Sequence, residues 1–133
     1  MDETQENTKN HMQKIPLHTS KTLSFETNEK HSAHAYGNIG VHAIATVTLI
    51  AFAEETSGQL LQPFLEENEM SVGTLVSIKH KAPAPIGAQI VVHSQLIQQQ
   101  QHKLMFSIQV LHQGTILLEG THGRVIQNRL LIS

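Results

Sequence analysis

The hydrophobic and polar positions of the chain change pattern several times along its length. Residues 1–15 carry almost no apolar side chains and are predicted to form a flexible tail ahead of one domain, residues 16–133. Residues 21–27 alternate loosely between polar and apolar, which predicts a first strand. Residues 31–44 have no clean period and contain several Gly and His, so they are interpreted as a loop with one irregular turn.

A long apolar run begins at Thr46 and is interrupted by a charge only at Glu54. It shows no alternation and continues to Leu61, so its length favours a helix over a strand. A helix that is hydrophobic on nearly every face is typical of a buried helix. Thr46 is the candidate N-cap, and Pro63 is expected to end the helix.

From Ser71 onward the pattern has a period of two, which is typical of strands. In the first of these strands, residues 71–80, the alternation places His80 with Val76 on one face and Gly73 on the other. Three more strands follow, joined by the hairpin connections QQQQH and HQG, and they are predicted at residues 89–96, 103–111 and 115–126.

The order of a strand, a loop, a buried helix and four strands predicts an α+β fold. A curled antiparallel sheet wrapped around one central buried helix, the hotdog fold, satisfies that order because the sheet then covers the helix. Such a sheet leaves one edge strand unpaired, so we expect a homodimer or a dimer of dimers.

Composition narrows the possible partners. Nine Lys and Arg against eleven Asp and Glu give a net charge of −2, which does not suggest a nucleic acid or an anionic membrane as partner. The absence of cysteine excludes disulfides, thiolate metal sites and a Cys nucleophile, and it fits a reducing cytoplasm. The polar N-terminus is not a signal peptide, and no apolar stretch is long enough to cross a bilayer.

Three side chains in these elements have the chemistry for catalysis, and each also has a plainer interpretation. Glu54 interrupts an apolar helix, where a carboxylate needs a partner, but it equally marks where the helix reaches solvent. Thr46 lies about 12 Å away along the axis and is either only an N-cap or part of a site for developing negative charge. His80 follows an apolar strand face and is either a hydrogen-bonded structural residue or a general base.

Other polar residues are weaker candidates. Arg124 shares a strand face with His122, and it is either solvated or binds the phosphate or pantetheine of a cofactor. His31 and His34 have a spacing that a metal ion accepts on a helix, and His42 follows them, but no carboxylate is fixed beside them by spacing. We therefore expect no metal.

Three segments resemble the fluoroacetyl-CoA thioesterase-like family of hotdog thioesterases: AIATVTLIAFAEET (43–56), SVGTLVSIKHKAPAPIGA (71–88) and LLEGTHGRVI (117–126). The shared features are a Thr at the helix start, a Glu eight residues later, VGT, a His before a Pro-x-Gly turn, and G-x-H-x-R. The resemblance implies a homodimeric thioesterase that hydrolyses acyl-CoA and needs no cofactor beyond the CoA of its substrate. It implies that Thr46, Glu54 and His80 are catalytic, that Gly73 lies beside the thioester, and that Arg124 holds CoA.

Two departures from the family pattern bear on the substrate. Ala84 stands where the family has Thr before the proline, and Gly37 and Gly40 precede the helix where fluoroacetyl-selective members have aromatic residues. We therefore expect a short or medium acyl-CoA as substrate. Two alternatives remain: a hotdog dehydratase or hydratase, and a non-catalytic module that binds acyl-CoA or another small ligand.

Overall fold

A computed structural model describes residues 13–129 of the chain. The predicted order of elements is confirmed, with three short 3₁₀ helices in addition. The strands and the long helix are β1 (Ser20–Glu26), α2 (Thr46–Leu61), β2 (Glu69–His80), β3 (Gln89–Gln100), β4 (Lys103–His112) and β5 (Thr115–Asn128). The 3₁₀ helices are η1 (Glu29–His31), η2 (His34–Tyr36) and η3 (Gln62–Phe64).

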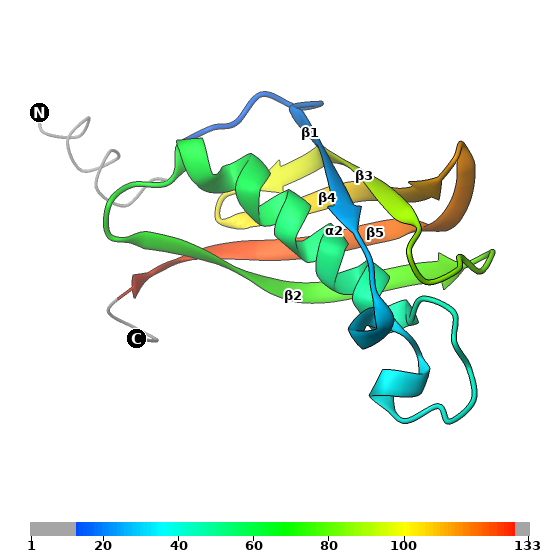
Figure 1. The fold of residues 1–133 in the computed structure, drawn as a ribbon. Helices are drawn as coiled ribbons and strands as arrows, with labels where there is room; N and C mark the ends of the chain where they lie inside the picture. Colours follow the sequence, from blue (N-terminus) through cyan, green and yellow to red (C-terminus); the bar gives the residue numbers. More distant parts are fainter. Residues whose placement is uncertain (1–12, 130–133) are drawn as a thin grey trace, which may run out of the picture.

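The strands form one antiparallel sheet in the order β1-β3-β4-β5-β2. The sheet curls, and α2 lies across one of its faces (Figure 1). The predicted hotdog architecture, a curled antiparallel sheet around one central helix, is thereby confirmed.

The core lies between α2 and the inner faces of β3, β4 and β5. Alternate residues of β3 and β4 are buried, as the period of two predicts, and the largest of them is Phe106. From the helix, Leu49, Phe52 and Leu61 pack into the same cluster. The hydroxyl groups of Ser57 and Ser94, both fully buried, hydrogen-bond each other at 2.7 Å and so satisfy two polar groups inside this core.

The prediction that α2 is buried on all faces is wrong in one respect. Val47, Ala51, Glu55 and Gln59 are exposed, and because they are spaced by four residues they form one stripe along the helix. The sheet of a single copy therefore covers only part of the helix surface.

The hairpin connections are shorter than the sequence suggested. Gln98–Gln100 belong to β3, and the turn to β4 is formed by Gln101, with a φ of 58°, and His102. The HQG connection is a hairpin as predicted. Its central residues, Gln113 and Gly114, both have positive φ, which matches the twist of the flanking strands.

The strand β2 forms an edge of the sheet. It pairs with β5 on one side, and its middle is open, with Leu75 46% and Val76 41% exposed. A long apolar edge strand of this kind is a surface on which another strand can pair.

The predicted flexible tail, residues 1–15, lies mostly outside the described residues. Its last residue, Ile15, is buried in the core, and its amide donates to the Gln99 side chain. Among residues 13–129 no helix has both the length and the apolar character that a membrane span requires.

Candidate active site

One stripe of α2 faces β2 and β5 and carries the residues of chemical interest. Thr46, Ile50, Glu54 and Gly58 follow each other at intervals of four and therefore lie on the same side of the helix. Thr46 meets the end of β2, Glu54 meets its middle, and Gly58 lies beside Arg124 of β5. The predicted site residues are thus spread along one side of the helix, from the end of β2 to Arg124 of β5.

Thr46 and His80 form a hydrogen-bonded pair at the start of the helix. The distance from Thr46 Oγ1 to His80 Nδ1 is 2.7 Å, and both residues are exposed. The sequence predicted Thr46 as the N-cap, and this prediction is wrong. Ala45 occupies the N-cap position and makes no side-chain cap. The Thr46 hydroxyl is therefore engaged with His80. When Nδ1 is the donor of this bond, His80 Nε2 is a free base.

Glu54 lies at a different point, about 12 Å from Thr46 along the helix axis. Its side chain is 44% exposed and rests against Gly73, where a Cβ atom would be 2.5 Å from Glu54 Oε2. On a single copy the structure therefore brings Thr46 to His80 and Glu54 to Gly73, but it does not bring the two pairs together.

Gly73 faces the helix because of a β-bulge, and its predicted orientation is wrong. The register between β2 and β5 shifts between Gly73 and Leu75, so Thr74 is the extra residue. This shift reverses the alternation, and Gly73 comes to the same side of the sheet as Val76 and Ile78. The simple period of two in the sequence contains no sign of such an insertion.

Arg124 lies on β5 at the end of the helix away from His80. It pairs with Gly73 across the sheet, and its Nε and Nη2 donate to the hydroxyl of Ser71 at 3.1 and 3.0 Å. Nη2 also donates to the Ser71 carbonyl at 3.0 Å. Burial lowers the pKa of Arg124, and the negative charge of Glu54 raises it in part. An open cavity of about 380 Å³, lined by Arg124, Arg129 and Gly58 among others, adjoins this guanidinium.

His122 was a weak candidate in the sequence, and the structure gives it a more prominent place. It is 2% exposed, and its Nε2 is 3.8 Å from Glu54 Oε2. Neither ring nitrogen has a hydrogen-bond partner among the described residues. Burial, and secondly the charge of Arg124, lower the pKa of His122 to about 4, so the ring is neutral at pH 7.

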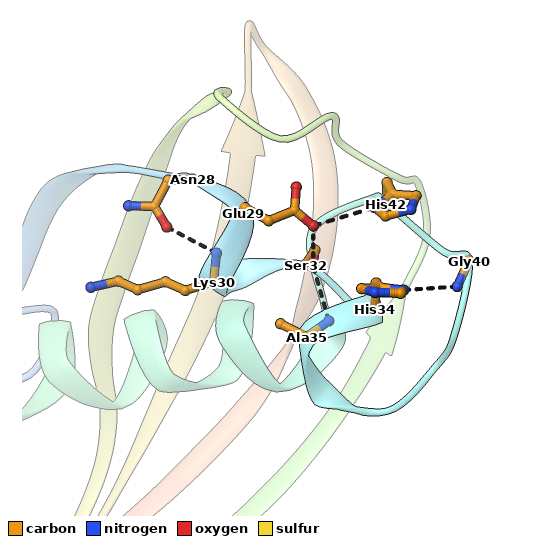
Figure 2. A network of polar contacts seen from close by, with 8 residues as sticks. All are labelled: Asn28, Glu29, Lys30, Ser32, His34, Ala35, Gly40 and His42. Carbon is orange, nitrogen blue, oxygen red and sulfur yellow. Dashed lines mark hydrogen bonds and ion pairs between the residues drawn. The ribbon is translucent and has the colours of Figure 1, made fainter.

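Two histidines of the loop before α2, His34 and His42, take part in a network of polar contacts, in which His42 is bonded to Glu29 and His34 to Gly40 (Figure 2). Glu29 Oε2 is 3.3 Å from His42 Nδ1 and accepts from the Ser32 hydroxyl at the same distance. The His34 ring stacks on His42, with centroids 4.7 Å apart, and its Nδ1 accepts from the Gly40 amide. Within residues 13–129 no three His, Asp or Glu side chains come close enough together to hold a metal ion. These contacts order the loop that leads into the helix.

Comparison with known proteins gives a consistent picture. Residues 27–129 match the family model described as fluoroacetyl-CoA-specific thioesterase. The solved fluoroacetyl-CoA thioesterase superposes with a TM-score of 0.82 at 18% identity, over 90% of this chain and 93% of that one. A Thermus thermophilus protein described as a thioesterase superfamily member superposes with a TM-score of 0.84 at 19% identity, over 91% of this chain and 90% of that one. A hot-dog-like protein from Thermanaerovibrio acidaminovorans superposes with a TM-score of 0.81 at 15% identity, over 89% of this chain and 87% of that one. No curated protein sequence matches the chain.

Proposed function

The chain belongs to the fluoroacetyl-CoA-specific thioesterase family and is an acyl-CoA thioesterase, and we propose that it hydrolyses short or medium acyl-CoA at a site completed by a second copy of itself. The observation that carries the proposal is the separation of the two reactive pairs. Thr46 with His80, and Glu54 with Gly73, both lie along the open β2 edge but too far apart to act on one carbonyl carbon.

Pairing of β2 with the β2 strand of a second copy brings complementary halves together. An antiparallel pairing whose twofold axis passes near Ser77 places Val76 opposite Ile78, so that helix-side residues face helix-side residues. The same pairing places His80 of one copy opposite the Gly73–Thr74 bulge of the other, beside Glu54. Each dimer then has two equivalent sites, and Val76, exposed on the helix side of a single copy, becomes covered.

The reaction adds water to the thioester, breaks the C–S bond, and releases the free acid and CoA. The first amides of α2 have no side-chain cap and support negative charge on the carbonyl oxygen as the carbonyl is attacked. Glu54 either takes a proton from the attacking water, or attacks the carbonyl carbon itself and expels the thiolate of CoA, leaving an anhydride that water then hydrolyses. His80 orients Glu54 or the water, takes up on its free Nε2 the proton that the water releases, and passes it to the departing sulfur, while Thr46 fixes the orientation of the His80 ring.

Arg124 is proposed to hold the CoA part of the substrate. Its guanidinium adjoins the open cavity next to Glu54, and a guanidinium is well shaped for phosphate and for the amide oxygens of pantetheine. Gly73, without a side chain, leaves the thioester room to approach Glu54. The reaction is proposed to need no metal and no cofactor beyond the CoA of the substrate.

The loop before α2 supports an acyl group larger than fluoroacetyl. Gly37 and Gly40 both have positive φ and face open space, because a Cβ atom at either position would have no other atom within 4 Å. The same loop exposes the apolar side chains of Tyr36, Ile39 and Val41. We propose that these side chains contact a short or medium acyl chain.

The enzyme is also proposed to act in the cytoplasm, without a nucleic-acid or membrane partner.

Release of free thiol from a panel of acyl-CoA esters tests the proposal. The wild-type protein is expected to hydrolyse short and medium chains, and Glu54→Ala and His80→Ala are each expected to lower kcat about 100-fold or more. His102→Ala, in the exposed β3–β4 turn, is the matched control and is expected to match the wild type. Tight CoA binding without turnover of any ester would favour a binding module. Turnover that survives both substitutions would refute the assignment of these residues.

A further inference from the structure

His122 combines three properties that together require an explanation. The side chain is almost fully buried, both ring nitrogens lack hydrogen-bond partners among the described residues, and Nε2 points to the Glu54 carboxylate. Most buried polar side chains are hydrogen-bonded, because an unpartnered buried polar group is destabilising. A histidine kept only to hold the fold together would therefore be expected to have a partner.

The cavity beside the ring is apolar except for Glu54, and Arg124 is the other charged group that acts on the ring. A small cavity between α2 and the sheet is lined by His122, Glu54 and six aliphatic side chains: Ile50, Ala53, Val76, Ile78, Ile108 and Leu118. The ring also lies against Phe106, its cross-strand neighbour on β4, with centroids 6.2 Å apart. The ring is thus fixed by packing, whereas the Glu54 side chain is 44% exposed.

From this geometry we infer that His122 is a positioning residue, whose neutral imidazole donates its Nε2–H to Glu54 Oε2 and so holds the carboxylate at Gly73. The observed separation of 3.8 Å becomes a hydrogen bond when Glu54 moves inward by less than one ångström. Gly73 permits this position, because a Cβ atom there would lie 3.4 Å from His122 Nε2 as well as against Glu54.

The neutral state of the ring suits this role. At pH 7 a ring with a pKa of about 4 carries one proton, which serves a single hydrogen bond to the carboxylate. A charged imidazolium would instead neutralise Glu54. The ring does not reach solvent, so it is not suited to carry protons to and from the bulk. The inference rests on the proposed function only in assigning Glu54 to catalysis.

Kinetics of three variants test the inference. His122→Gln keeps an amide N–H near the position of Nε2, and its kcat is expected to stay within about threefold of wild type. His122→Leu removes the donor and is expected to lower kcat about tenfold or more, with KM little changed and the melting temperature equal or higher. Ile90→Val, in the buried core of β3 and away from the ring, is expected to lower the melting temperature while kcat is kept.

The coupling between the two residues gives the sharper result. In a Glu54→Gln background, His122→Leu is expected to have no further effect on kcat, because the bond it removes is already changed. The inference would be overturned if His122→Leu lowered kcat equally in the wild type and in Glu54→Gln. It would also be overturned if His122→Gln and His122→Leu lowered kcat equally, or if His122→Leu left kcat unchanged.

A measurement without turnover separates this inference from the proposed function. Imidazole ¹⁵N NMR of the wild-type protein is expected to show His122 neutral at pH 7 with its proton on Nε2, and a shifted Nε2 resonance in Glu54→Gln. A proton on Nδ1, or no response to Glu54→Gln, would overturn the inference even in an active enzyme. If the protein shows the expected spectrum but hydrolyses no thioester, the contact between His122 and Glu54 is supported and the proposed hydrolysis is refuted.

Discussion

At the scale of single residues, the site is set by a few contacts that each side chain makes across the fold. The Thr46 hydroxyl orients His80, Gly73 leaves room for Glu54, and Ser71 holds Arg124. These contacts involve polar groups at the surface or at its margin. His122 differs from them because it is buried, and its burial has a consequence for stability as well as for the site.

The stability of the fold is expected to fall as the pH is lowered through the range in which His122 titrates in the unfolded chain. Its pKa is about 4 in the folded protein, lowered from 6.5, so between these values the unfolded chain binds a proton that the folded one does not. By linkage the free energy of unfolding decreases over that range by up to about 3 kcal/mol, with no further change from this residue below it.

Urea unfolding of the wild type and of His122→Gln at pH 7, 5.5 and 4 measures this effect. The variant is expected to lose less stability than the wild type on acidification, because the other histidines are the same in both proteins. An equal loss in the two proteins would contradict the lowered pKa.

Thr46, Glu54 and His80 stand at the start, the interruption and the end of local patterns, but their catalytic roles were predicted from the resemblance to a family. The sequence did not reveal which of them meet, since that depends on how α2 crosses the sheet. His122 was recognised only as a strand residue on the face of Arg124. Its burial depends on Phe106 and Val76, which lie opposite it on β4 and β2 and far from it in the chain.

At the scale of elements, the helix and the strands could be predicted from the hydrophobic periods of the sequence. The irregularities of these elements could not. The periods of α2 and of the four later strands reflect which face packs on the core, so they are visible in a single sequence. The bulge at Thr74 depends on the register between β2 and β5, which arises from pairing across more than forty residues of chain. The stripe of α2 that stays exposed likewise depends on how far the sheet curls.

The bulge makes Gly73→Ala a test of the relation between β2 and α2. The added Cβ would lie 2.5 Å from Glu54 Oε2, so the carboxylate must move away from the strand. We expect kcat to fall about tenfold to 100-fold, because a displacement of about 1 Å at a catalytic group has an effect of this size. The melting temperature is expected to change little, since residue 73 lies on an exposed edge strand.

Lys79→Ala, on the outer face of the same strand, is the control and is expected to keep wild-type kcat. Retention of full activity in Gly73→Ala would show that Glu54 does not act from its position beside the bulge.

At the scale of the whole molecule, the β2 edge and one stripe of α2 are exposed on a single copy. The proposed register predicts a specific crosslink. Residues that lie opposite each other in an antiparallel pair have Cα atoms about 4.5 to 5.5 Å apart, within reach of a disulfide. Because the chain has no cysteine, a single introduced thiol gives an unambiguous product.

Ser77→Cys is therefore expected to form a covalent dimer under mild oxidation, since residue 77 lies at the proposed axis and faces its own copy. Lys79→Cys is expected to crosslink poorly, because residue 79 would lie opposite Leu75. Non-reducing electrophoresis distinguishes the two. Efficient crosslinking through residue 79 and not through residue 77 would place the axis elsewhere, and a monomer by light scattering would remove the interface altogether.

The proposed sharing of each site between two copies also predicts complementation between inactive variants. When Glu54→Ala and His80→Ala chains are unfolded together and refolded, half of the dimers are expected to be mixed. Each mixed dimer has one site with both residues intact and one site that lacks both. The mixture is therefore expected to recover about a quarter of the wild-type activity, although each chain alone is nearly inactive. A mixture of Glu54→Ala and Glu54→Gln restores no site and is the control. If the first mixture stays as inactive as its components, Glu54 and His80 act within one chain, and α2 must then shift along β2 to bring them together.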